Sequence, residues 1–307
     1  MTGFSAASAG STRSAVSARS SRKLVELSGT AATAALSADS VIVLPTGAIE
    51  HHGPHLPLMT DYLIADSVAN ASVVRAASEG QDVWILPTLA YTKSDEHHWA
   101  PGTMWISWDT LMQTVVELGN SIAATPARKL VFFNGHGGNL ALLQVACREL
   151  RRRFGLQTFL MGATVPAGAH DGPEEFGLGI HAGHSETSLV LHLRPDLVDL
   201  SVAERSVPEH LAGYEHIGFK KRVTFGWLSN DFSTNGTLGD PTGATAAYGA
   251  ELFDAAVEDS VAAFAEIALF DAAGPRGGAG AESAGAVAAG AVDLESVEVV
   301  ELGVGEA

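Results

Sequence analysis

The sequence predicts an α/β domain of three layers, α/β/α, in which helices cover both faces of a mostly parallel central sheet. Four short apolar runs have the form of strands that are buried on both faces, and helical patterns separate them along the chain. Alternation of this kind favours a parallel sheet, because parallel strands are joined by crossovers that usually contain a helix. No internal repeat or linker interrupts residues 24–270, so we expect a single domain there.

The expected elements follow one another from residue 41 to residue 163. The strand runs are VIVLP at 41–45, VWILP at 83–87, KLVFFN at 129–134 and QTFLMGA at 157–163. The helical patterns cover residues 61–77, 108–124 and 140–154. The third helix gathers arginines in its last turn, where cations suit the helix dipole, and Gly155 then supplies a stop. Cys147 falls on the apolar stripe of this helix, which favours a core position over a role as nucleophile.

The two ends of the chain differ in composition from the domain. Residues 1–23 are rich in Ala and Ser, carry basic but no acidic residues, and lack the apolar stretch of a secretory signal. We interpret them as a disordered leader, with an organelle transit peptide as the alternative. Residues 271–307 form an acidic, Gly/Ala-rich tail of low complexity, which we also expect to be disordered.

Composition argues against several classes of function. The 307 residues carry 18 basic and 35 acidic side chains, a formal net charge of −17. Such an acidic protein repels phosphate backbones, so we expect no nucleic-acid partner. No apolar run is long enough to span a bilayer, so we expect no membrane association. The single cysteine excludes an internal disulfide and favours the cytoplasm.

Polar side chains gather directly after the predicted strands. Glu50 and His52 follow the first strand, and they point to the same side if the backbone stays extended beyond Gly47. Asp61 stands at the start of the next helix, and His136 follows the third strand within NGHGGN. The carboxyl ends of parallel strands form the ligand crevice of such folds, and carboxylates and imidazoles bind divalent metals. The sequence therefore predicts a metal site at this edge.

The distribution of histidines supports this interpretation. Eight of the 12 histidines fall in four short segments near predicted strand ends: 50–55, 94–99, 134–139 and 179–188. One histidine beside one glutamate would usually be an ordinary surface or core residue. NGHGG alone could be a phosphate-binding turn, although it lacks the Lys-Ser/Thr pair of a P-loop. It is the coincidence of the four segments that favours a metal site.

The same segments resemble the creatininase family of amidohydrolases. LPTGAIEHHGPHLPLMTD is similar to the opening motif of that family, and SDEHHWAPGT is similar to its segment S-x-E-H-x-x-x-P-G-T. FNGHGGN and HAGHSETS resemble two further family motifs. The resemblance covers roughly residues 40–195 in the family order.

The resemblance implies a pair of divalent metal ions per subunit: zinc, manganese or iron. Glu50 and His52 would each bind a different metal, and Asp61 would bridge the two. His136 would complete one site and Glu186 the other. The family fold is often assembled as a hexamer, so we expect a homo-oligomer.

The implied activity is hydrolysis of an amide-type C–N bond by a metal-activated water. His181 is the expected catalytic residue, because an imidazole can bring a proton to the leaving nitrogen near neutral pH. A role in orienting other groups is its alternative. We assign Ser94, Glu96 and His97, from the second motif, to binding of a small-molecule substrate.

The sequence leaves the substrate open. Creatinine-specific members carry Tyr-Glu after the loop histidine, where this chain has Gly137 and Gly138, which argues against creatinine. A cyclic amide or a formamide is the prediction. The alternatives are a peptide-trimming metallopeptidase, a hydrolase that opens a keto-inositol ring at a C–C bond, and a non-catalytic metal-binding protein. The segment 205–243 has little periodicity, and we expect it near the site or at an oligomer contact.

Overall fold

The computed structural model of this chain describes residues 21–165 and 173–272. The predictions of disorder for the leader and the tail therefore fall almost wholly outside the described residues. Among the helices that are described, none is long and apolar enough to cross a membrane.

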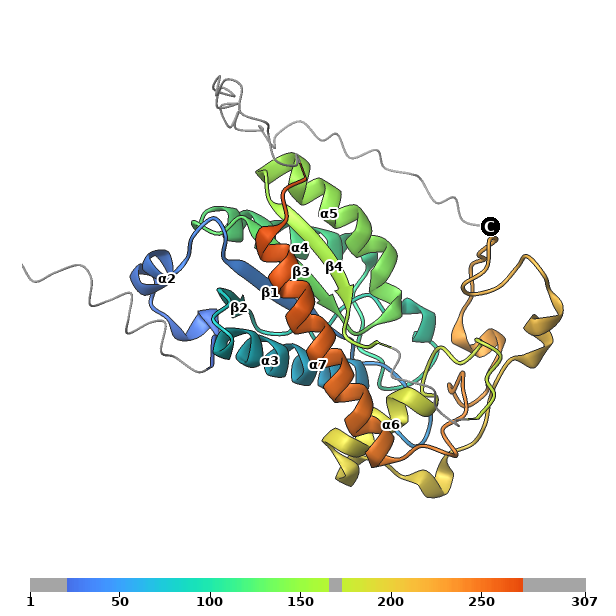
Figure 1. Ribbon diagram of the computed structural model, residues 1–307. Helices are drawn as coiled ribbons and strands as arrows, with labels where there is room; N and C mark the ends of the chain where they lie inside the picture. The colour runs from blue at the N-terminus through green and yellow to red at the C-terminus, as the bar shows by residue number, and fades with distance from the viewer. Residues whose placement is uncertain (1–20, 166–172, 273–307) are drawn as a thin grey trace, which may run out of the picture. The chain divides into compact units, whose positions relative to one another are not determined.

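A parallel sheet of four strands lies at the centre of the domain (Figure 1). Its order is β2-β1-β3-β4, and the strands are β1 (Val41–Thr46), β2 (Val83–Ile85), β3 (Lys129–Asn134) and β4 (Gln157–Gly162). β1 and β3 pair in register from Val41↔Lys129 to Thr46↔Asn134. Every residue of β1 is buried, which the continuous apolar run requires of a strand that is covered on both faces.

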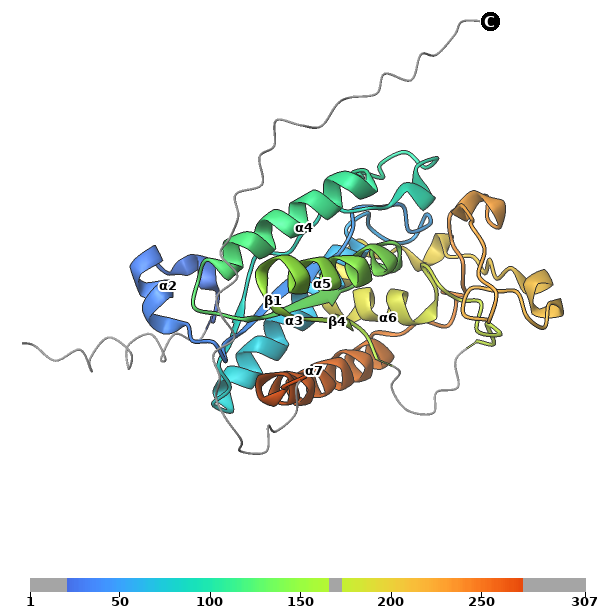
Figure 2. The ribbon, with the colours of Figure 1, turned by 90° about the horizontal axis from the view of Figure 1, so that it is seen from above.

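Helices cover both faces of the sheet, as Figure 2 shows. α4 (Trp108–Ala123) and α5 (Leu140–Phe154) pack on one face, over a core that includes Ile42 and Phe132. α3 (Thr60–Ser78) and α7 (Ala246–Leu269) pack on the other, over a core that includes Val43 and Phe133. Successive strand residues thus enter opposite cores, as strand geometry dictates. The predicted three-layer α/β/α fold is confirmed.

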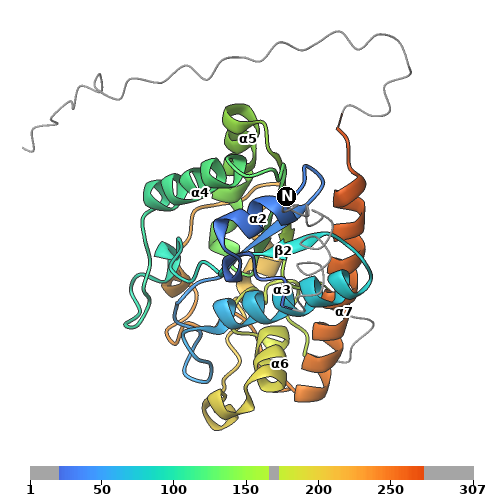
Figure 3. The same ribbon diagram turned by 90° about the vertical axis from the view of Figure 1, so that its left-hand side faces the viewer.

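The remaining described elements are short. They comprise α2 (Gly29–Ala35), α6 (His184–Leu193), which packs against α7, and 3-10 helices at Leu24–Glu26, Asp95–His97, Gly137–Asn139, Pro195–Leu197, Leu200–Val202, Glu209–Gly213 and Ser229–Asp231. Figure 3 shows α6 beside α3 and α7. α6 and the segment that follows it lie on the side to which the carboxyl end of β4 points (Figure 1).

Arg22 and Lys23, assigned to the leader from composition alone, contact β2. The guanidinium of Arg22 lies 4.8 Å above the ring of Trp84. The backbone carbonyl of Arg22 accepts a hydrogen bond from the N–H of Ile85 at 3.0 Å. Lys23 forms an isolated parallel bridge with Ile85. These two residues extend the pairing of an edge strand, which composition cannot reveal.

Candidate metal centre

Two glycines let the first turn of α3 approach the ends of β1 and β3. A Cβ on Gly47 would lie 2.5 Å from the Cα of Tyr62, and one on Gly135 would lie 2.9 Å from the Cβ of Ala65. Both positions therefore have room only for glycine. This close approach holds Asp61, in the first turn of α3, between the two strand ends.

The loop after β1 carries Glu50 and His52. β1 ends at Thr46, and Glu50 lies in a loop that folds back, with its N–H bonded to the carbonyl of Leu58 at 2.9 Å. Glu50 and His52 still converge, with 3.8 Å between Oε1 and Nε2, and both are fully buried. This loop therefore brings both side chains to one place.

Among the residues that the structure describes, six side chains form three overlapping groups, and within each group the possible ligand atoms lie within 4.8 Å of one another. The groups are Glu50–Asp61–His136, His52–Asp61–Glu186 and Glu50–His52–His181. Oδ1 of Asp61 lies 3.1 Å from Nε2 of His52, and Oδ2 lies 2.9 Å from Nδ1 of His136. Each carboxylate oxygen of Asp61 thus faces a different histidine, as a carboxylate shared by two ions would. The fold brings the five sequence-predicted ligands and His181 into one cluster.

Three histidines of this cluster are oriented by backbone carbonyls. The bonds are Nδ1 of His52 to the carbonyl of Glu50 (3.1 Å), Nε2 of His136 to that of Lys93 (2.8 Å) and Nε2 of His181 to that of His51 (2.7 Å). A carbonyl only accepts, so in the neutral ring this nitrogen carries the proton. The other nitrogen of each ring faces the carboxylates, and in the neutral ring its lone pair is directed at them. That is the orientation a metal-binding imidazole requires.

Burial and mutual attraction shift the pKa values within the cluster. Burial alone would lower the pKa of His52, but the charges of Asp61, Glu50 and Glu186 raise it to about 9. Burial also opposes ionisation of Asp61, yet His52 and His136 hold its pKa well below the usual range. Burial raises the pKa of Glu186 to about 7, against the attraction of His52. In the absence of metal, protons on groups such as His52 and Glu186 therefore balance the negative charge of the carboxylates.

One oxygen of Glu50 tests whether the cluster fits a cation. Within the described part of the chain, no hydrogen bond reaches its buried Oε1. The nearest imidazole nitrogens, those of His181, His97 and His52, stand at 3.5, 3.7 and 3.8 Å. A buried acceptor left unpaired costs about 1–3 kcal/mol, and more when it is charged. A divalent ion among these groups would remove that cost, so the residues fit a metal.

The three residues assigned to substrate binding are buried against the candidate ligands. Ser94 Oγ donates a short hydrogen bond to Glu50, Glu96 lies 3.3 Å from His136, and the ring of His97 stacks on that of His181 at 4.1 Å. Their observed partners are therefore protein groups of the cluster itself.

Two contacts of the cluster come from residues that were not selected from the sequence. Lys93 and His51 supply the carbonyls that orient His136 and His181. A backbone carbonyl is independent of side-chain type, so no motif could reveal it. The only available signal was their position beside motif residues.

The segment 205–243 reaches the same loops, as expected. Nε1 of Trp99 donates to Oγ of Ser229 at 2.6 Å, and the backbones of His181 and Leu238 form an antiparallel bridge. The segment thus supports the loop that carries His97 and the strand-like stretch that carries His181.

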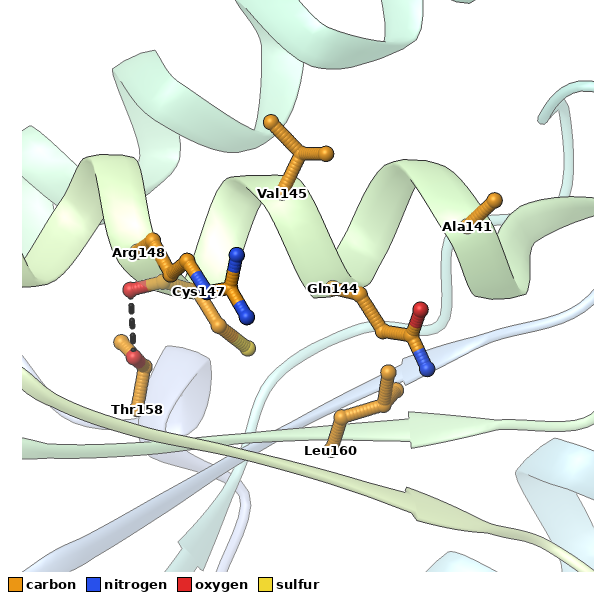
Figure 4. A pocket seen from close by; sticks show the side chains of 7 residues that line it. All are labelled: Ala141, Gln144, Val145, Cys147, Arg148, Thr158 and Leu160. Carbon is orange, nitrogen blue, oxygen red and sulfur yellow. Dashed lines mark hydrogen bonds between the residues drawn. The ribbon is translucent and has the colours of Figure 1, made fainter.

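A separate open pocket of about 500 Å³ lies between α5 and β4 (Figure 4). It is lined by Ala141, Gln144, Val145, Cys147, Arg148, Thr158 and Leu160. Oγ1 of Thr158 donates to the carbonyl of Cys147 at 2.7 Å, and burial raises the pKa of the Cys147 thiol. A thiol that stays protonated is a poor nucleophile, so this pocket lacks the chemistry of the metal cluster.

Comparison with known proteins decides the family. A family model described as "Creatininase: Creatinine amidohydrolase" matches residues 25–264. The chain belongs to the creatininase family. It is therefore an amidohydrolase, an enzyme that hydrolyses amide C–N bonds.

Relatives and solved structures agree with this assignment. The mycofactocin precursor peptide peptidase of Mycobacterium tuberculosis is 39% identical over 234 residues, which is 73% of this chain and 84% of the relative. The creatinine amidohydrolase of Pseudomonas putida is 35% identical over 183 residues, 53% of this chain and 68% of the relative. A mutant creatininase structure described as the Zn-Zn type has a TM-score of 0.62 and 27% identity, and the match covers 80% of this chain and 98% of that one.

Proposed function

We propose that this amidohydrolase uses two divalent ions bridged by Asp61. The observation that carries the proposal is that Asp61 belongs both to the group with Glu50 and His136 and to the group with His52 and Glu186. Carboxylate and imidazole ligands suit zinc, manganese and iron. Such ions, when bound, lower the pKa of water and polarise a carbonyl group.

In this proposal, His181 moves a proton at Nδ1. Its Nε2–H is held by the carbonyl of His51, so Nδ1 is the nitrogen that can accept. Burial, and then the charges of His52 and His97, hold the pKa of His181 well below its usual range, which keeps the ring neutral. His181 takes a proton from the attacking water and returns it to the leaving nitrogen as the C–N bond breaks. A ligand role is the competing possibility, because Nδ1 lies 3.5 Å from Oε1 of Glu50.

A peptide amide is the substrate class that the comparisons favour. The similarity to the peptide peptidase spans 234 residues at 39% identity, against 183 residues at 35% for the creatinine amidohydrolase. Gly137 and Gly138 replace the Tyr-Glu associated with creatinine specificity. We therefore place a peptide ahead of a cyclic amide or a formamide, which reverses the order predicted from the sequence.

A substrate panel tests this proposal. The full chain, loaded with zinc or manganese, is incubated with short peptides, formamides, cyclic amides and a keto-inositol. We expect one new amine and one new carboxylate per peptide cleaved, abolished by a chelator and restored by metal. Turnover of small cyclic amides alone would overturn the peptide assignment. A chain that holds two ions and cleaves none of the amides would be the non-catalytic metal-binding protein instead.

We also propose a cytoplasmic homo-oligomer, specifically a hexamer. Light scattering on the purified full chain measures its mass directly. A monomer at micromolar concentration would contradict this proposal without affecting the chemistry above.

A further inference from the structure

Glu96 uses both of its carboxylate oxygens on protein groups beside the metal cluster. Oε1 lies 3.3 Å from Nε2 of His136, and Oε2 accepts a hydrogen bond from Nζ of Lys93 at 3.0 Å. The ammonium of Lys93 thus forms an ion pair with the carboxylate of Glu96. Each oxygen therefore has a protein partner in the cluster or beside it.

Gly138 provides the space that this carboxylate needs. A Cβ at residue 138 would lie well inside van der Waals contact with both Oε1 of Glu96 and Nε2 of His136. Any side chain there would push one of them aside. A Cβ at the adjacent Gly137 would meet nothing within 4 Å. The requirement for glycine is thus specific to position 138.

We propose that Glu96 is a positioning residue for His136, in place of the substrate-binding role predicted from the sequence. Nε2–H of His136 points to two acceptors, the carbonyl of Lys93 at 2.8 Å and the carboxylate of Glu96 at 3.3 Å. The carbonyl is closer, but the carboxylate adds negative charge, which strengthens the hydrogen bond and makes the ring a better ligand. Together they turn Nδ1 toward Asp61 and Glu50, at 2.9 and 3.3 Å.

The inference rests on the proposed metal pair, and it predicts that the support acts on one ion only. His136 belongs to the group with Glu50 and Asp61, whereas the group with His52 and Glu186 does not contain it. Loss of an acceptor behind a metal-binding histidine typically weakens binding about 10–100-fold. Glu96 should therefore affect the ion at His136 and leave the other unchanged.

The test titrates both ions into the metal-free full chain in competition with a chromophoric chelator. Glu96→Gln keeps the size of the side chain and removes its charge. We expect it to weaken one ion about 10–100-fold, to leave the second ion and the unfolding temperature of the metal-free chain unchanged, and to alter the visible spectrum of the cobalt-substituted protein. Gly138→Ala should weaken the same ion, and Gly137→Ala is the matched control that should behave as wild type.

Three outcomes would overturn the inference. Wild-type affinity for both ions in Glu96→Gln, together with a raised KM, would make Glu96 a substrate-binding residue after all. Equal weakening of both ions with a lower unfolding temperature would show a general structural role. A wild-type chain that binds no ion would remove the proposed function, and the inference with it.

Discussion

The loops after β1 and β3 present a histidine to the same carboxylate, but they support it differently. His52 and His136 each bond a backbone carbonyl through one ring nitrogen and face Asp61 through the other. For His52 the carbonyl belongs to Glu50, two residues earlier in the same loop. For His136 the support comes from the separate segment 93–96. One ligand is therefore organised locally and the other by long-range packing, so the ion at His136 should be the more easily disturbed.

The largest loss of metal and activity is expected from substitution of Asp61, which belongs to both groups of possible ligands. Asp61→Asn replaces the shared carboxylate by an amide, which is a poor ligand for divalent ions, so both ions and all activity should be lost. Elemental analysis of the purified variant measures this. Asp66→Asn, on the same helix but bonded to Thr88 away from the cluster, is the control and should keep both ions. Two full equivalents in Asp61→Asn would refute the bridging role.

Substituting one ligand at a time distinguishes the two proposed ion sites. His52→Ala and Glu186→Gln should deplete the same ion, because His52 and Glu186 belong to one group of possible ligands. His136→Ala should deplete the other ion, because His136 belongs to the group with Glu50. Metal content and affinity of the three variants provide the comparison. If His52→Ala and His136→Ala lose the same ion, the two-group description is wrong.

His181 is also oriented by a hydrogen bond to a backbone carbonyl, but we propose that it does not bind a metal ion. His181→Ala should keep both ions and the fold but lose about 10²–10⁴-fold in turnover, the usual contribution of acid–base help. Steady-state kinetics on the metal-loaded variant measures the loss. The exposed His98 provides the control substitution to Ala. Loss of an ion in His181→Ala would instead make His181 a ligand.

Metal affinity should depend on pH because both supported histidines must lose a proton to bind. Burial alone would lower the pKa of both rings. In the metal-free chain Asp61 is the chief group that raises the pKa of His52, to about 9, and Glu50 and Asp61 raise that of His136 well above 6.5. Their protonated forms stabilise the metal-free fold below about pH 6.5, and this stabilisation is lost as the pH rises through about 9. Affinity should rise about tenfold per pH unit for each proton displaced. Calorimetry in buffers of different ionisation heat counts these protons, and none released at pH 7 would contradict the assignment.

The smallest effect is expected from the ends of the chain. A chain shortened to residues 21–270 should keep its metal content, activity and unfolding temperature, because the contacts that support the cluster lie within this range. Further trimming to residue 24 should lower the unfolding temperature, since it removes Arg22 from the ring of Trp84. Thermal unfolding of the two shortened chains compares them. A large loss in the longer one would show that an end of the chain docks on the domain.

Local patterns were sufficient to predict most of the fold, whereas the full set of cluster residues came from the resemblance to the family motifs. β3 and α5 have the bounds expected from their apolar runs, because burial on both faces or on one stripe leaves a direct trace in the sequence. Contacts between distant backbones leave no such trace. The carbonyl of Lys93 behind His136, 43 positions away, and the pairing of Lys23 with β2 were therefore missed. The hydrogen bond from Glu50 N–H to the carbonyl of Leu58 was missed for the same reason.

The most direct test of the shared carboxylate is a crystal structure of the metal-loaded full chain with anomalous data at the absorption edge of the bound metal. Our account predicts two anomalous peaks, one beside His136 and one beside His52, with an oxygen of Asp61 bound to each. A single peak, or two peaks that do not share Asp61, would contradict it.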